Sequence, residues 1–227
     1  MSKQHLFVEH FFATPIFYGA ILDEKFHSEL INLYKDCDEK GWFKQEWGED
    51  QWEGQYSKKQ SERDNDTTAS TIYFQPRQNI LEDNEFLENT ILRYAHGYLD
   101  NIETPERNLN IHSSWMHKAK HKDAVGWHHH GYKENRISGV YYIKANDVVN
   151  GGRTLFKSPN PYTGDFTAFS ARAYKPQVDF QPVERNMLMW PSSIDHRTTP
   201  NWTKNPRIIM SFNIDIDYQD DDYHHGV

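Results

Sequence analysis

The chain has 227 residues with 25 basic and 33 acidic side chains, so its formal net charge is −8 with neutral histidines. That length suits one domain with a well-buried core, and the acidic balance disfavours bulk nucleic acid and anionic membrane surfaces as partners. The chain has a single cysteine, Cys37, so it cannot form an intramolecular disulfide. Its start shows no secretory pattern, and it has no apolar stretch of about 18 residues. We therefore expect a cytoplasmic protein.

The first half of the chain reads as helices and loops. Residues 7–22 favour an extended segment, and apolar side chains at helical spacing then predict a helix over 24–39, with Asp23 as its cap. An apolar face within 81–100 predicts a second helix. Between the helices, residues 42–63 contain three tryptophans in a polar setting. This loop is interpreted as a lid over an active site, or alternatively as a packed surface loop or an oligomer contact.

From residue 108 onward, short runs rich in Ile, Val, Tyr, Phe and Trp alternate with Gly, Pro and Asn clusters. So many strands after two helices predict a mainly β fold with flanking helices (α+β), built as a jelly roll, or double-stranded β-helix. We expect a single domain over 1–227. It would comprise a helical and loop part over 1–106, a jelly-roll core over 107–217 and an acidic tail over 218–227.

Three consecutive histidines, His128 to His130, precede one of these strands. On an extended strand residues i and i+2 share a face, so His128 and His130 can converge on one metal ion while His129 points away. A third ligand has to come from elsewhere, and His196 is the best candidate because it follows a buried-looking strand that ends at a Pro-Ser turn. The competing interpretation is a solvated cluster without a metal.

Eleven residues after His196, Arg207 opens another apolar strand. Inside a barrel a guanidinium needs an anionic partner, which a dicarboxylate ligand would supply by bidentate pairing. A structural salt bridge to an acidic side chain is the alternative at this point.

Five short motifs in a fixed order carry a family resemblance. They are WHHHG (127–131), SGVYY (138–142), GGRTLF (151–156), WPSSIDH (190–196) and NPRIIMSFNI (205–214). With them the chain resembles the Fe(II)- and 2-oxoglutarate-dependent oxygenases over about Trp115 to Ile214. Within that superfamily it is most similar to a group of bacterial and phage oxygenases with a Trp-His-x-His pattern.

The resemblance implies a dioxygenase that hydroxylates a small molecule or a peptide and uses Fe(II), 2-oxoglutarate and O2. It implies His128 and His196 as iron ligands, and Arg207 as the partner of the distal carboxylate of 2-oxoglutarate. Whichever of Tyr141 and Tyr142 points inward would hydrogen-bond the cosubstrate, since strand alternation allows only one. The oligomeric state stays open, a dimer included.

Ser211 is a lesser candidate for the cosubstrate, because on a regular strand it would face the same way as Arg207.

The third metal ligand and the type of metalloprotein have alternatives. Most of the superfamily has a carboxylate where this chain has His130; Glu134 and Asp195 are alternative third ligands, and spacing favours His130. Three histidines also suit zinc. Besides the oxygenase, a second interpretation is a cupin-like metalloprotein that does not use 2-oxoglutarate. A third is a non-enzymatic jelly-roll protein.

Overall fold

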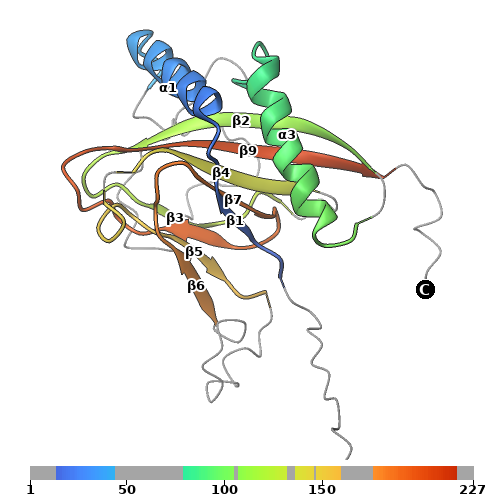
Figure 1. Cartoon of the computed structure of the whole chain (residues 1–227). Helices are drawn as coiled ribbons and strands as arrows, with labels where there is room; N and C mark the ends of the chain where they lie inside the picture. Colours follow the sequence, from blue (N-terminus) through green and yellow to red (C-terminus); the bar gives the residue numbers. More distant parts are fainter. Residues whose placement is uncertain are drawn as a thin grey trace, which may run out of the picture.

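The computed structural model describes residues 14–43, 79–104, 107–131, 136–145, 147–159 and 176–218. In this part of the chain, two helices cover one face of a structure of two β-sheets (Figure 1). The helices are α1 (Glu24–Glu39) and α3 (Glu85–Asp100). The strands are β1 (Phe17–Ala20), β2 (Arg107–Ala119), β3 (Val125–His128), β4 (Arg136–Lys144), β5 (Thr154–Lys157), β6 (Gln177–Phe180), β7 (Asn186–Pro191), β8 (His196–Thr198) and β9 (Arg207–Tyr218).

Both helices begin at side-chain caps. The Asp23 carboxylate accepts the backbone N–H of Phe26 at 3.0 Å, which confirms the predicted start of α1. The Asn84 side chain accepts the N–H of Leu87 at 3.1 Å. The second helix therefore starts at Glu85, inside the predicted range, and residues 81–83 lie in a turn before it.

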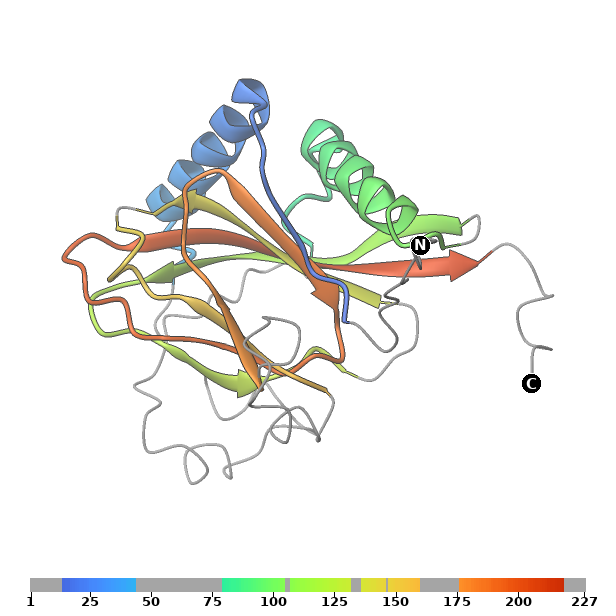
Figure 2. The same cartoon turned by 60° about the horizontal axis from the view of Figure 1, so that its bottom comes forward.

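The strands form two antiparallel sheets. The larger sheet has the order β1-β7-β4-β9-β2, and the smaller has the order β3-β8-β5-β6. Figure 2 shows both helices on one side of the larger sheet and the smaller sheet on its other side. Two facing antiparallel sheets with helices on one outer face confirm the predicted jelly roll with flanking helices.

Alternation along the central strands divides the apolar side chains into two cores. Tyr141 and Phe212 belong to the core between the larger sheet and the helices. Their neighbours in sequence or on the same strand, Tyr142 and Ile209, belong to a second core between the two sheets, with Trp190. Because side chains alternate between faces, successive apolar residues of β4 and β9 belong to one core or the other. The core between the sheets is the one that surrounds the candidate site.

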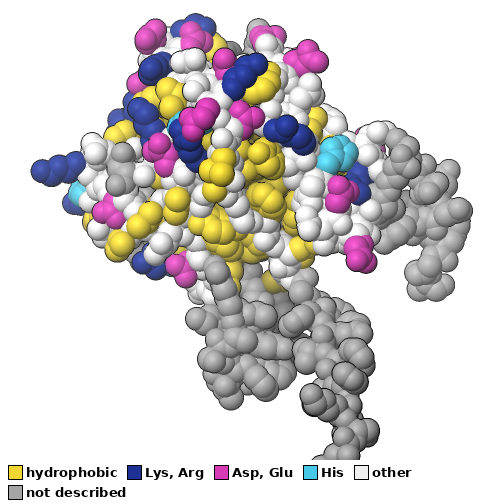
Figure 3. Space-filling model, viewed as in Figure 1, with side chains coloured by type: hydrophobic (Ala, Val, Ile, Leu, Met, Phe, Trp, Pro, Cys, Tyr) yellow, Lys and Arg dark blue, Asp and Glu magenta, His cyan; other side chains and the backbone are white. Residues whose placement is uncertain are grey.

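Charged side chains of both signs are interspersed over the helices in the space-filling view (Figure 3). That face therefore presents no field of a single sign. None of the described helices is long and apolar enough to span a membrane.

Several expectations fall outside the described residues. Of the segment 42–63 only residues 42 and 43 are described, and of the tail only Tyr218, the last residue of β9, is described. The division of the chain into one domain with these parts stays a prediction.

Candidate metal centre

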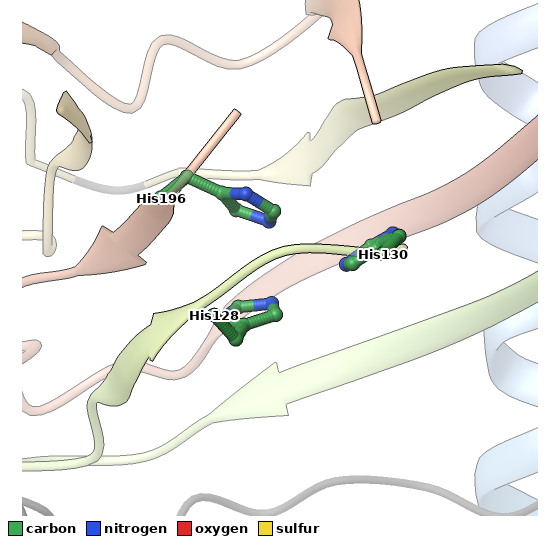
Figure 4. Close-up of side chains that lie close together, drawn as sticks. All are labelled: His128, His130 and His196. Carbon is green, nitrogen blue, oxygen red and sulfur yellow. The ribbon is translucent and has the colours of Figure 1, made fainter. Parts of the chain in front are cut away.

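The three predicted histidines meet between the two sheets. His128 ends β3 and His196 begins β8, and the two residues are paired across these strands. His130 lies two residues beyond His128, and its backbone N–H donates to the carbonyl of Ser192 at 3.0 Å. The possible ligand atoms of the three side chains all lie within 4.8 Å of one another, as the close-up shows (Figure 4). Asp195 is not part of this cluster, and Glu134 lies outside the described residues.

Each of the three rings has its Nδ1 atom engaged by an oxygen acceptor. The contacts are His128 Nδ1 to Gly126 O at 2.9 Å, His196 Nδ1 to Ile194 O at 2.9 Å, and His130 Nδ1 to Asn213 Oδ1 at 2.7 Å. A carbonyl or amide oxygen can only accept a hydrogen bond, so Nδ1 is the nitrogen that carries the proton in each ring. The lone pair of each ring is therefore on Nε2, and an outer hydrogen bond to Nδ1 is the usual way in which proteins orient a metal-binding imidazole.

The contact of His130 is the only one of the three that involves a side chain. The amide of Asn213 is itself oriented, because its Nδ2 donates to Ser113 Oγ at 3.0 Å and its Oδ1 accepts from Ser138 Oγ at 2.7 Å. Ser138 also lies 2.7 Å from the hydroxyl of Ser192. This polar group therefore fixes the orientation of the His130 ring.

Burial keeps the three imidazoles neutral. Loss of hydration is the largest cause that lowers the pKa of each ring, and it lowers the pKa of His130 to about 3. The pKa of His196 falls well below its usual value, helped by the nearby His128 and His130. Neutral imidazole is the form that binds a metal ion, so the protonation state of the cluster already suits one.

Arg207 lies in the same core, at the start of β9, and only 2% of it is exposed. Its Nη1 donates to the carbonyl of Gly152, whereas its buried Nε and Nη2 atoms have no hydrogen-bond partner in the described structure. Among the residues that the structure describes, no acidic side chain forms the salt bridge considered as an alternative. A buried guanidinium with two free donors on one side is unusual and points to an anionic ligand.

Gly152 makes room for this arginine. Its φ is +83°, and an added Cβ would lie 2.6 Å from Nη1 of Arg207. Both the backbone conformation and the close approach require glycine, which gives a physical reason for the second glycine of the GGRTLF motif.

The two tyrosines of β4 point in opposite directions. Tyr142 is fully buried between the sheets, and its hydroxyl lies 2.7 Å from Thr154 Oγ1. Tyr141 lies in the helix-side core, where its hydroxyl is 3.0 Å from Nδ1 of His27. Of the two tyrosines, Tyr142 is thus the one that faces the core between the sheets, and its contact with a cosubstrate stays a prediction. Ser211 is buried, two positions along β9 from Ile209, and shares the face of Arg207 as expected.

Two buried polar side chains near the cluster, Asn213 and His117, were not among the residues predicted for the site. Asn213 lies within the NPRIIMSFNI motif, and His117 lies on β2. His117 is 3% exposed and its Nε2 has no hydrogen-bond partner in the described structure. The signal available for both was alternation, because Asn213 shares a face of β9 with Arg207 and Ser211, and His117 shares a face of β2 with Trp115.

Fold and contacts together define a jelly-roll protein with a candidate metal centre and a buried cationic side chain between its sheets. Residues 113–213 match the model of a family described as "Putative 2OG-Fe(II) oxygenase". The match confirms the resemblance drawn from the motifs, and its range includes all three histidines and Arg207. The narrower expectation of a bacterial or phage group with a His-x-His pattern stays a prediction. No curated protein matches the chain significantly.

Solved structures with the same fold are distant in sequence. The α-ketoglutarate-dependent epimerase SnoN of nogalamycin biosynthesis is 14% identical, with a TM-score of 0.55 over 89% of this chain and 77% of that one. A prolyl-4-hydroxylase of Pseudomonas putida is 13% identical, with a TM-score of 0.51 over 91% and 89%. HygX of Streptomyces hygroscopicus, solved with nickel and 2-oxoglutarate bound, is 8% identical, with a TM-score of 0.54 over 89% and 83%. At these identities the likeness shows the fold alone.

Proposed function

We propose that this protein is an Fe(II)- and 2-oxoglutarate-dependent dioxygenase that hydroxylates a small molecule or a peptide. One observation carries the proposal: within the described residues, three clustered imidazoles that bond oxygen atoms through Nδ1 share a core with a guanidinium that has two unpartnered donors. The family match and the metal and 2-oxoglutarate bound to HygX support it.

The donor set fits the metal. Imidazole suits iron as well as zinc and other first-row ions, and His128, His130 and His196 would hold the ion from one side, which leaves positions for other ligands. When bound, Fe(II) with 2-oxoglutarate activates O2 for attack on a C–H bond of the substrate.

Three imidazoles leave the charge of a divalent ion uncompensated, because none of them is anionic. The dianion of 2-oxoglutarate would offset that charge. We therefore infer that occupancy of this metal centre depends more strongly on the cosubstrate than in a site with a carboxylate ligand.

Arg207 would anchor the distal carboxylate. Its unpartnered Nε and Nη2 lie on the same side of the guanidinium and form the two-pronged donor pair that binds a carboxylate bidentately. Tyr142 is close enough to Arg207 for each to act electrostatically on the other, and its hydroxyl is a second donor at that end. Trp190 and Phe156, both almost fully buried, would exclude water from the reacting groups.

The direct test is conversion of 2-oxoglutarate to succinate by purified protein with Fe(II) and ascorbate. The wild type is expected to form succinate only with Fe(II), and His196→Ala to lose that activity. Tyr141→Phe serves as the control, because Tyr141 lies in the other core, and it should retain the activity.

Two results would contradict the proposal. One is the absence of any metal-dependent binding or conversion of 2-oxoglutarate by the wild type. The other is full activity in an Arg207→Met variant, which would instead favour a three-histidine metalloprotein that does not use 2-oxoglutarate.

A further inference from the structure

His117 occupies the interior face of the larger sheet beside the proposed cosubstrate anchor. In the register of β2 and β9 it pairs with Ile209, so Arg207 and Ser211 are its diagonal neighbours on β9. Diagonal neighbours on one face lie about 7–8 Å apart at Cα, within reach of long side chains. The side chain of His117 therefore lies on the same face of the sheet as Arg207 and next to it.

The His117 ring lacks a hydrogen-bond partner for one of its nitrogens among the described residues. Nε2 of His117 is buried without a hydrogen bond in the described structure, and such groups are rare in folded proteins because they lose hydration without replacing it. The charged or titratable groups that act on the ring are Arg207 and His128. These two residues belong to the two ends of the proposed site, the anion anchor and the metal cluster.

The ring is neutral in the folded protein. Burial, followed by the nearby Arg207, lowers the pKa of His117 to about 3. A neutral imidazole keeps one N–H donor, and the residue adds no charge to the site. It can satisfy an oxygen of a bound anion without repelling the guanidinium.

We propose that His117 is a third binding residue for the keto acid, with its Nε2–H donating to a carboxylate oxygen of bound 2-oxoglutarate. The inference rests on the proposed function. Arg207 alone offers two unpartnered nitrogens, whereas the two carboxylates of the ligand offer four oxygens. His117 thus supplies a donor that lies outside the five motifs of this sequence, and its buried nitrogen gains a partner that the described residues do not provide.

The test compares 2-oxoglutarate binding by wild type, His117→Phe and His117→Gln, each loaded with Ni(II) to prevent turnover. Phenylalanine keeps the ring and removes the donor, and glutamine replaces the donor with an amide. His121→Phe is the matched control, since His121 is exposed and contacts Trp202 and Thr203 away from this core. Binding of Ni(II) and of 2-oxoglutarate is measured by calorimetry, and folding by thermal unfolding.

The expected result for His117→Phe is a dissociation constant for 2-oxoglutarate about 10- to 100-fold higher, as for loss of a hydrogen bond to a charged group. Its Ni(II) affinity should be unchanged, and its ligand-free melting temperature should be equal to or above that of the wild type, because an unsatisfied nitrogen is removed. His117→Gln should recover most of the affinity. If the phenylalanine variant does not fold, His117→Leu replaces it.

Unchanged 2-oxoglutarate affinity in the phenylalanine or leucine variant would overturn this inference and leave the proposed function standing. So would a parallel loss of Ni(II) binding, which would place His117 at the metal instead. A wild type that binds Ni(II) but not 2-oxoglutarate would overturn both.

Discussion

Replacing Arg207 with methionine separates the effect of this buried side chain on folding stability from its effect on 2-oxoglutarate binding. The substitution removes the hydrogen bond to the carbonyl of Gly152, which destabilises the fold. It also removes two buried nitrogens without partners, which stabilises the fold. Each effect is about 1–3 kcal/mol, so we expect the ligand-free stability of Arg207→Met to stay within about 2 kcal/mol of the wild type.

The effect of the ligand has no such compensation. At a 2-oxoglutarate concentration 100 times its dissociation constant, binding stabilises the wild type by about 2.7 kcal/mol. For a chain of this size that corresponds to a rise of about 5–10 °C in melting temperature. The methionine variant should show almost none of this rise at the same concentration, because the distal carboxylate would be buried without its cation.

The assay is thermal unfolding of the Ni(II)-loaded protein with and without 2-oxoglutarate. Arg197→Met is the matched control. Arg197 also has a buried, unpartnered Nε, but it stacks on Trp127 and follows His196 on β8, so it faces away from the core between the sheets. A rise in melting temperature of wild-type size in Arg207→Met, or its loss in Arg197→Met, would refute the reasoning.

Three further predictions concern Asn213, Gly152 and His130, and Gly97→Ala on α3 serves as a comparison for the second. Asn213→Leu removes the acceptor that orients His130 and should weaken Fe(II) binding about 10- to 100-fold in a competition titration; unchanged affinity would show that the ring needs no such partner. Gly152→Ala forces a Cβ against Arg207 at a φ of +83° and should lower both stability, by about 1–2 kcal/mol or more, and 2-oxoglutarate affinity. Gly97→Ala, with open space around a helical glycine, should instead stabilise the protein by about 0.5–1 kcal/mol. In the metal-free protein, the His130 ring has a folded pKa of about 3 against an ordinary 6.5, so the unfolded chain takes up the proton first as the pH falls. The contribution of the neutral His130 ring to the free energy of unfolding is complete above pH 6.5 and is lost toward pH 3. Urea unfolding should therefore show a free energy of unfolding about 2 kcal/mol lower at pH 5 than at pH 6.5 because of this group. Equal stability at the two pH values would contradict a neutral, buried ring.

The fold was predictable because its signals are local. Asp23 ahead of an apolar helical face fixes the start of α1, and short β-rich runs separated by turn residues indicate antiparallel strands. The spacing of His128 and His130 was equally informative, because a strand sets which residues share a face.

What the sequence left open depends on contacts between strands distant in the chain. Alternation required that one of Tyr141 and Tyr142 face inward, but only packing against the helices decides which one. The orientation of His130 by Asn213 joins residues 83 positions apart, and the position of His117 beside Arg207 follows from the register of β2 and β9. No local pattern encodes these pairings.

The central claim is that the histidine cluster and Arg207 together bind a metal and 2-oxoglutarate. An anaerobic calorimetric titration of 2-oxoglutarate into the protein, with and without Fe(II), tests it most directly. We predict stoichiometric binding to the Fe(II)-loaded protein and binding at least 10-fold weaker without the metal. Without Fe(II), 2-oxoglutarate would still contact Arg207 but would have no contact with a metal ion. Equal binding with and without Fe(II), or no binding in either case, would contradict the account.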